Sequence, residues 1–335
     1  MRGDVRNNDA RATVSRRVLL GAAATTLAVP GMARAQSWPN GPIRLVVPFA
    51  PGGSTDISAR FLAEGLGQRL GVSVVVENRP GAGATTGSQV VADAAPDGQT
   101  LVMSNIASHG ISPTLYGRRV RYDPVQSFTH VAMVITNPST WVVNKDSGIS
   151  SLADIVRMAK ERQGGLDMAS SGAGSSNHLL IVRFSQLAGI PFTHVPFRGA
   201  GPAMQAVIAG QVPMMSDSLP SSAGHIRQGS VRAVAMSSAE RHPSFPEVPT
   251  FREQGFDLVS TSWFALSGPA GMPPAIVERL HREVMAVISS PTARARFAEL
   301  GGSPGDMTPV EFSSFVAAEV ERWAPVVRAS GAAVD

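Results

Sequence analysis

The sequence predicts an α/β protein with two lobes, each built on a parallel sheet, and a ligand cleft between them. Short β-branched runs alternate with longer segments of helical periodicity, the pattern of parallel strands joined by helical crossovers. This alternation occurs in two blocks, which a long β-rich stretch over 128–143 separates. About 300 residues follow the first 35, a length that suggests two domains.

The first block starts with a buried strand over 43–47, which Pro51-Gly52-Gly53 ends. A helix then opens at Thr55-Asp56, and its apolar side chains recur at helical spacing: Ile57, Phe61, Leu62, Leu66 and Leu70. The remaining elements of this block are a strand over 72–76, a helix over 83–92 and a strand over 100–103.

The β-rich stretch is broken at Asn137-Pro138, where we interpret the chain as leaving the first lobe. The second block then contains, in order, helix 152–162, strand 166–169, helix 178–188, strand 192–197, helix 201–209, strand 212–216, a short helix around Ile226 and strand 231–236. A strand over 262–266 returns toward the first lobe, and two helices near 275–289 and 309–329 close the chain. We expect lobe 1 to comprise 36–137 and 250–335, lobe 2 to comprise 138–249, and the cleft to close by hinge motion.

The first 35 residues have the features of a cleaved export signal. Arg16-Arg17 precede an apolar run over 18–29, and Ala33-Arg34-Ala35 matches the small-x-small cleavage pattern. The run is too short to span a bilayer permanently, since about 20 residues are needed. The paired arginines favour the twin-arginine route, although a general secretory signal can also carry them. The sequence therefore predicts a periplasmic protein cleaved near Ala35.

Charge and composition exclude several classes of partner and site. The first 35 residues carry six Arg and two Asp, which equals the net charge of +4 of the whole chain, so the remainder is close to neutral. No basic patch points to nucleic acid or to an anionic membrane. The absence of cysteine excludes disulfides, zinc-thiolate sites and thiol catalysis. We expect a monomer without cofactor or metal.

Motifs of known catalytic chemistry are absent. There is no G-x-S-x-G elbow, no metal-spaced histidine pair and no P-loop lysine. The run over 81–87 has its third glycine one residue late for a dinucleotide site and is more simply a strand-to-helix turn. An enzyme is therefore not expected, although Ser, His and Asp are available for a triad assembled in space.

Small polar loops at the carboxyl ends of predicted strands are the strongest functional signal. Ligands of open parallel sheets bind at this edge, and helix N-termini there attract carboxylates. The four loops run from Phe49 to Asp56, Ser104 to Ser108, Ser171 to His178 and Phe197 to Gly201. Together they predict an anion-binding cleft.

Single side chains in these loops, and Asp217 just after the strand over 212–216, are open to two interpretations. Arg198 suits a ligand carboxylate or a surface salt bridge, and Asp217 suits a ligand amino or hydroxyl group or the cap of a turn. Phe49 suits the apolar body of a ligand or the core. Asp56 is most simply an N-terminal helix residue that holds its loop, and His178 is more often a helix-start residue than a ligand contact.

An ordered set of motifs resembles the tripartite tricarboxylate transporter substrate-binding proteins, also called the Bug family. The motifs run from about Trp38 to the end of the chain: VPFAPGGSTD (47–56), VVVENRPGAG (74–83), PDG (96–98), YDP (122–124), GS and HL (174–175 and 178–179), HVPFRG (194–199), PEVPT (246–250) and PAG (269–271). The resemblance implies a type II periplasmic-binding-protein fold, a small carboxylate ligand held by loop backbone, hydroxyls and waters, and delivery to a membrane permease.

By position, the resemblance and the loops together suggest these ligand-binding residues: Phe49, Ala50, Gly53, Ser54, Thr55, Asp56, Ser104, Asn105, Ser108, Ser171, Gly174, Ser175, His178, Arg198, Gly199, Ala200 and Asp217. Two departures leave the identity of the ligand open. Phe197-Arg198-Gly199 stands where Tyr-Lys-Gly is common, and Ser112-Pro113 stands where Asn-Pro is usual.

Two other functions remain compatible with the sequence. A sensor subunit that signals to a membrane kinase would share every feature above. An exported hydrolase would need a triad, with Ser175 as its nucleophile.

Overall fold

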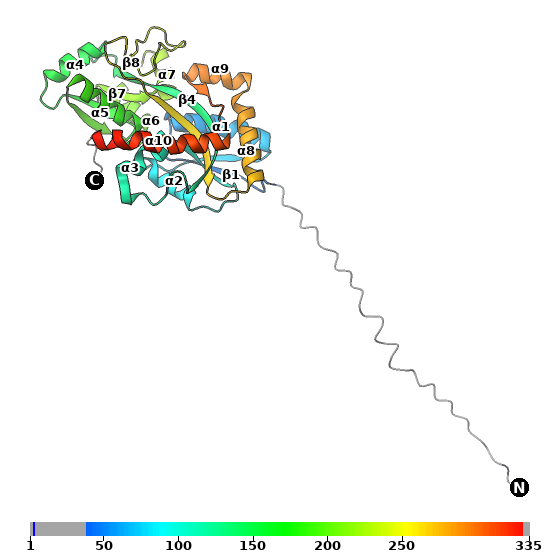
Figure 1. Ribbon diagram of the computed structural model, residues 1–335. Coiled ribbons are helices and arrows are strands. Elements are labelled where there is room, and N and C mark those ends of the chain that lie inside the picture. The colour runs from blue at the N-terminus through cyan, green and yellow to red at the C-terminus, as the bar shows by residue number, and fades with distance from the viewer. Residues whose placement is uncertain (1–2, 4–37, 331–335) are drawn as a thin grey trace. The chain divides into compact units, whose positions relative to one another are not determined.

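The structure, a computed structural model, describes residue 3 and residues 38–330 (Figure 1). Apart from Gly3, the predicted export signal lies outside the described residues. From Trp38 onward the chain forms one compact unit, so the boundaries expected between two lobes stay a prediction. None of the helices in 38–330 combines the length and apolarity needed to cross a membrane.

The elements alternate as predicted in both blocks. The first block contains β1 (Ile43–Val47), α1 (Ser54–Leu70), β2 (Val74–Asn78), the 3₁₀ turn η1 (Ala82–Ala84), α2 (Thr85–Ala92), β3 (Thr100–Asn105), the π-helical turn η2 (Ala107–Ile111), α3 (Ser112–Tyr116) and the 3₁₀ turn η3 (Gly117–Arg119). After the long strand β4 (Phe128–Asn144), the second contains α4 (Leu152–Lys160), β5 (Leu166–Ser170), α5 (Ser176–Ala188), β6 (Phe192–Pro196), α6 (Ala200–Ile208), β7 (Met214–Ser218), α7 (Leu219–Arg227) and β8 (Val231–Met236). The chain closes with β9 (Thr261–Pro269), α8 (Pro274–Ile288), α9 (Pro291–Leu300), β10 (Ser303–Pro304) and α10 (Pro309–Ser330).

The strands of 38–330 form a mixed sheet with two parallel parts. Its order is β2-β1-β3-β9-β4-β7-β5-β6, and β8 and β10 also pair with β4. β1 is parallel to β2 and β3, and β5 is parallel to β6 and β7. β4 and β9 are antiparallel to their neighbours and join the two parts. Below, the β1–β3 side means the part built on β1, β2 and β3, and the β5–β7 side means the part built on β5, β6 and β7.

β4 is a continuous strand, so the break expected at Asn137-Pro138 is wrong. Pro138 is the last residue of β4 that pairs with β9, and Ser139 is the first that pairs with β7. Proline has no N–H for a ladder, and it is tolerated here because the strand changes partners at this position. The chain therefore passes from one side of the sheet to the other without leaving the β conformation.

Separate hydrophobic clusters hold the two sides. On the β1–β3 side, α1 and α8 cover the sheet with residues such as Leu62, Leu66, Leu280 and Val284, all of them buried. On the β5–β7 side, Trp141 of β4 packs against a cluster of aromatic rings from α5 and the segment after β8. The long helix α10 crosses in front of β4 in Figure 1 and buries Phe312 and Val316 with residues of η2 and β9.

Several boundaries differ from the sequence predictions because pairing partners extend or shift the strands. β2 starts at Val74, in register with Ile43, after Gly71 ends α1 in the left-handed conformation. β7 extends to Ser218 because Asp217 pairs with Thr140 of β4, so Asp217 lies within a strand and not after it. α9 was not predicted, although Ser290-Pro291 carries an N-cap and an N1 proline and the Ser290 hydroxyl accepts from the Ala293 N–H.

Candidate functional site

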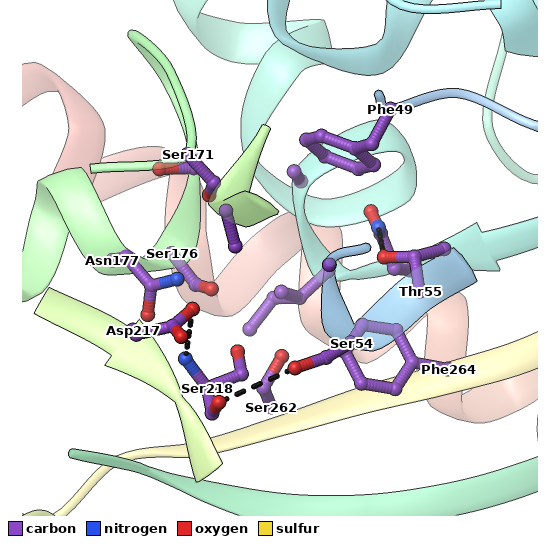
Figure 2. A pocket seen from close by; sticks show the side chains of 16 residues that line it. Phe49, Ser54, Thr55, Ser171, Ser176, Asn177, Asp217, Ser218, Ser262 and Phe264 are labelled. Carbon is purple, nitrogen blue, oxygen red and sulfur yellow. Dashed lines mark hydrogen bonds between the residues drawn. The ribbon is translucent and has the colours of Figure 1, made fainter. Parts of the chain in front are cut away.

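A cavity lies at the carboxyl ends of β1, β3, β5 and β7, between the two sides of the sheet. It has about 380 Å³ of empty space, including its open mouth. The lining residues are Phe49, Gly53, Ser54, Thr55, Asn105, Ile106, Ala107, Ser171, Ser175, Ser176, Asn177, Ala200, Asp217, Ser218, Ser262 and Phe264 (Figure 2). This cavity, called the inner cavity below, lies at the edge of the sheet at which open α/β proteins bind their ligands.

The N-terminus of α1 forms one wall. Gly53 is its N-cap and provides no side-chain cap, and Ser54 and Thr55 of the first turn line the cavity. The buried face of α1 is polar over its first turn and apolar from Ala59 onward. This change along one helix follows from its position, since the first turn faces the cavity and the rest packs on the sheet.

Asp56 holds the loop before α1 in shape without lining the cavity. Its carboxylate accepts from the Gly52 N–H (2.9 Å), from Arg60 Nε (2.9 Å) and from Asn78 Nδ2 (2.9 Å). Asn78 also donates to the Phe49 carbonyl (3.0 Å). Burial alone would raise the pKa of Asp56, but these hydrogen bonds and the Arg60 charge keep it below its usual value. The ionised carboxylate therefore fixes the loop from Phe49 to Gly53.

Asn105 enters the cavity from the end of β3 and is held by its neighbours. Its Nδ2 donates to Thr55 Oγ1 (3.3 Å), and its Oδ1 accepts from the Ser108 N–H (3.0 Å). Ser108 itself lies in η2, and the Ser104 hydroxyl bonds to the Ala265 carbonyl and to Ser267 (2.9 Å). Of the three residues predicted in this loop, only Asn105 lines the cavity; Ser108 holds the Asn105 side chain, and Ser104 bonds to β9.

The loop from Ser171 to Ser175 and the start of α5 form the facing wall. Ser175 caps α5, its hydroxyl accepting from the His178 N–H (3.1 Å). The His178 ring lies behind the loop, where Nδ1 accepts from the Gly174 N–H (3.2 Å) and the ring stacks on His194 at 3.8 Å. Burial lowers the pKa of His178 to about 4; burial and the neighbouring His178 lower that of His194 to about 3. Both rings are therefore neutral supports at neutral pH.

The turn before α6 brings backbone from the two sides together. The Ala50 N–H donates to the Arg198 carbonyl (3.0 Å). Gly199 has φ 148°, and a Cβ there would lie 3.1 Å from the Ala50 nitrogen, so this close approach needs glycine. Ala200 lines the inner cavity, whereas the Arg198 side chain lines an outer cavity of about 580 Å³. Ala50 and Gly199 make the contact and line neither cavity.

Asp217 lies deep in the wall on the β5–β7 side and is fully buried. Its Oδ1 accepts from the Ser218 N–H (2.8 Å), and its Oδ2 accepts from the hydroxyls of Ser221 (2.5 Å) and Ser222 (2.6 Å). Ser54 links this cluster to α1, since its hydroxyl lies 2.9 Å from Ser221 Oγ and accepts from the Ser221 N–H (3.0 Å). Burial raises the pKa of Asp217, and these three donors act against that rise.

Nine of the predicted site residues line the inner cavity: Phe49, Gly53, Ser54, Thr55, Asn105, Ser171, Ser175, Ala200 and Asp217. Arg198 lines the outer one, and Ala50, Asp56, Ser104, Ser108, Gly174, His178 and Gly199 line neither. Ligand binding by any of them stays a prediction.

Sequence reasoning missed seven residues of the lining: Ile106, Ala107, Ser176, Asn177, Ser218, Ser262 and Phe264. Ser176 and Asn177 fall inside a loop that was predicted, so its polar composition already indicated them. Ser262 and Phe264 come from β9, whose antiparallel pairing with β3 and β4 is non-local and leaves no signal in the sequence.

The inner cavity offers donors of hydrogen bonds but no cation. Among the described residues that line it there is no lysine, arginine or histidine, and the first turns of α1, α5 and α6 all reach it. The positive ends of helix dipoles and the Ser, Thr and Asn groups suit an anion, while Phe49 and Phe264 offer apolar contact. No group of metal-ligating side chains occurs within 38–330.

Comparison with known proteins gives matches over nearly the whole chain. A family model described as tripartite tricarboxylate transporter family receptor matches residues 58–332. Protein BugT of Bordetella pertussis is 35% identical over 315 residues, which cover 94% of this chain and 97% of BugT.

Solved structures agree with the fold. Rpa4515 of R. palustris, solved with adipate, has a TM-score of 0.85 at 33% identity and covers 88% of this chain and 99% of its own. MatC from Rhodopseudomonas palustris, with bound malate, has a TM-score of 0.82 at 33% identity. The match covers 86% of this chain and 99% of MatC. The predicted fold class, an α/β type II periplasmic-binding-protein fold, is confirmed.

Proposed function

The chain belongs to the tripartite tricarboxylate transporter receptor family, and on that premise we propose that it captures a small organic acid in the periplasm and delivers it to the permease of a tripartite transporter. The family consists of substrate-binding proteins and not of enzymes. The resemblance found in the sequence is thereby confirmed at the level of the family. The acid and the permease are parts of the proposal.

One observation carries the carboxylate assignment. Three helix N-termini, those of α1, α5 and α6, reach a single cavity whose described lining contains no side-chain cation. Backbone N–H groups and hydroxyls at such termini hold carboxylates without a salt bridge. The adipate and malate in the similar structures support a carboxylate as the ligand class here.

Contacts across the cavity support closure of the two sides about the ligand. The Ala50 N–H bonds to the Arg198 carbonyl, and Ser54 bonds to Ser221. We take the predicted lobes, 36–137 with 250–335 and 138–249, as the bodies that move. In the closed form the acid is shielded from water, so its hydrogen bonds strengthen in the lower dielectric. The closed form also fixes the relative position of the lobe surfaces that contact the permease.

A thermal-shift screen of residues 36–335 against organic acids tests the proposal. An acid at a hundred times its Kd adds about 2.7 kcal/mol to the free energy of unfolding, which gives a clear rise in Tm. Thr55→Val should weaken the response, because Thr55 lines the cavity and accepts from Asn105. Thr129→Val is the matched control, since Thr129 bonds to Pro269 on β9 and does not line the cavity.

The results of the thermal-shift screen distinguish a carboxylate site from other ligand sites. A rise in Tm with one class of acid, reduced in Thr55→Val and kept in Thr129→Val, supports the assignment. A response to neutral compounds alone would contradict the carboxylate site. Delivery to a permease is tested by uptake of the same acid in cells that lack this chain: uptake that does not depend on it would contradict the transport role.

A further inference from the structure

The inner and outer cavities carry opposite charges. Among the described residues, the only charged side chain that lines the inner cavity is Asp217, which is buried. The only charged side chain of the described residues that lines the outer cavity is Arg198, which is exposed. A carboxylate therefore finds a fixed positive charge in the outer cavity and none in the inner one.

The outer cavity adjoins the inner one at the end away from Asp217. Phe49, Ser171 and Ser175 line both cavities. Figure 2 shows Phe49 and Ser171 at one end of the inner cavity and Asp217 and Ser218 toward the other. An acid that comes from the outer cavity would pass the three shared residues first and would meet Asp217 last.

Arg198 is held by its backbone, while its side chain has no partner. Its carbonyl accepts from the Ala50 N–H (3.0 Å), and the preceding Phe197 N–H donates to the Ser170 carbonyl (3.1 Å). The Arg198 guanidinium forms no hydrogen bond or ion pair with any residue of 38–330. The turn that carries Arg198 is therefore fixed, and no neighbouring carboxylate neutralises the cation at the outer cavity.

The two cavities attract an acid over different distances. The effect of a helix N-terminus falls off within the first turn, so the inner cavity attracts a carboxylate only at short range. The full charge of an arginine acts over about 10 Å at an ionic strength of 0.1 M. Of the residues that line the two cavities, Arg198 is thus the one that draws an acid in from solution. It does not line the inner cavity, where the carboxylate finally lies.

We propose that the outer cavity is an encounter site for the acid, where Arg198 binds the carboxylate transiently before the acid passes Phe49 and reaches the helix N-termini. The inference rests on the proposed function, which assigns only the final position of the carboxylate. Arg198 then speeds association and leaves dissociation nearly unchanged. An arginine that contacts the bound acid would instead act mainly on dissociation, where most effects of lost contacts appear.

Stopped-flow tryptophan fluorescence of residues 36–335 tests this inference. The probe is whichever of adipate, malate, propionate and benzoate binds most tightly by calorimetry. In Arg198→Gln we expect association about three to ten times slower at low ionic strength, and dissociation within about twofold of the wild type. Salt at about 0.5 M should bring the wild-type association rate close to that of the variant, since it screens the charge.

Arg183→Gln is the matched control. Arg183 is also exposed and lies in α5 on the β5–β7 side, but it lines neither cavity, so association should keep the wild-type rate. Equal slowing in both variants would overturn the inference, because the effect would then be one of net charge.

Two other results also overturn it and leave the proposed function standing. One is an unchanged association rate in Arg198→Gln. The other is faster dissociation at an unchanged association rate, which would put Arg198 in contact with the bound acid. If none of the four acids binds, the inference and the proposed function both fail.

Discussion

Asp56 holds the loop from Phe49 to Gly53 from outside the cavity, and its substitution should affect both folding and binding. In Asp56→Ala, the Gly52 N–H, Asn78 and Arg60 lose their acceptor. We expect a loss of about 2 kcal/mol in the free energy of unfolding, since three hydrogen bonds to a buried carboxylate are removed, and weaker acid binding because the loop from Phe49 to Gly53 loosens. Urea unfolding and the thermal-shift response measure the two effects.

Asp154→Ala is the control for Asp56→Ala. Asp154 also accepts several local hydrogen bonds, from Ser150 and Ser151, but it lies at the exposed start of α4. A loss of about 1 kcal/mol, without a change in ligand affinity, is expected from such a cap. Equal effects of the two substitutions on affinity would contradict the role of Asp56 in positioning the loop.

The stacked histidines His178 and His194 should make the protein less stable as the pH falls below about 6.5, which is well above the pH at which carboxylates titrate. Burial holds their pKa values at about 4 and about 3, below the ordinary 6.5. As pH falls below 6.5 the unfolded chain takes up protons that the folded chain does not, so unfolding is favoured. Each histidine then costs up to about 2 kcal/mol at pH 5.

Urea unfolding at pH 7 and pH 5 measures this slope. A His178→Gln variant should show a smaller loss between the two pH values. It should not remove the loss, because burial also lowers the pKa of His109, which lies close to His130, and that of His130 to about 4. An unchanged slope in His178→Gln would show that this ring is not neutral in the folded protein.

At the scale of elements, the approach of α6 to the loop before α1 depends on a glycine. A Cβ at Gly201 would lie 2.4 Å from the Pro51 carbonyl oxygen in the loop before α1. In Gly201→Ala the two elements must separate, so we expect acid affinity to fall about tenfold or more, as for a 1–3 kcal/mol overpacking strain. Calorimetric titration measures the affinity.

Gly224→Ala is the matched control for Gly201→Ala. Gly224 lies within α7, and a Cβ there meets no atom within 4 Å. Alanine in a helix interior should raise the free energy of unfolding by about 0.5–1 kcal/mol and leave binding unchanged. If Gly201→Ala binds acid as well as Gly224→Ala does, the contact at Pro51 is not needed for binding.

At the scale of the whole molecule, the long strand β4 pairs with β9 along its first part and with β7 along its second, and two hydrogen-bonded contacts join the β1–β3 side to the β5–β7 side. Ala50 with Arg198 and Ser54 with Ser221 are contacts that opening would break. We expect small-angle X-ray scattering to show a smaller radius of gyration with saturating acid than without it, as hinge closure requires. An unchanged radius while calorimetry shows binding would contradict closure.

Export concerns the part of the chain that precedes the described fold. We expect the processed protein to begin at Gln36, after Ala33-Arg34-Ala35, which mass spectrometry of the periplasmic fraction measures. Replacing Arg16 and Arg17 by lysine should leave the chain unprocessed in the cytoplasm, because the twin-arginine route needs the pair. Arg11→Lys is the control. Normal processing of the double variant would assign the chain to the general secretory route.

Local pattern was sufficient for the fold class, the order of most elements and the loops that meet at the cavity. The strand over 43–47 and the helix that follows it were predicted because a β-branched run and a 3.6-residue period are visible within a few residues. The loops from Phe49 to Asp56 and from Ser171 to His178 were indicated by small polar residues placed after strands. Family motifs extended these predictions along the chain.

Tertiary structure decided what each polar residue faces. The sequence does not show that β9 inserts between β3 and β4, and therefore it did not indicate Ser262 or Phe264. Nor did it separate Asn105, which lines the cavity, from Ser108, which holds the Asn105 side chain, and Ser104, which bonds to β9. It also did not show that Asp217 is buried and accepts three hydrogen bonds at the start of α7. These distinctions arise from contacts between residues far apart in the chain, and no local period or composition encodes them.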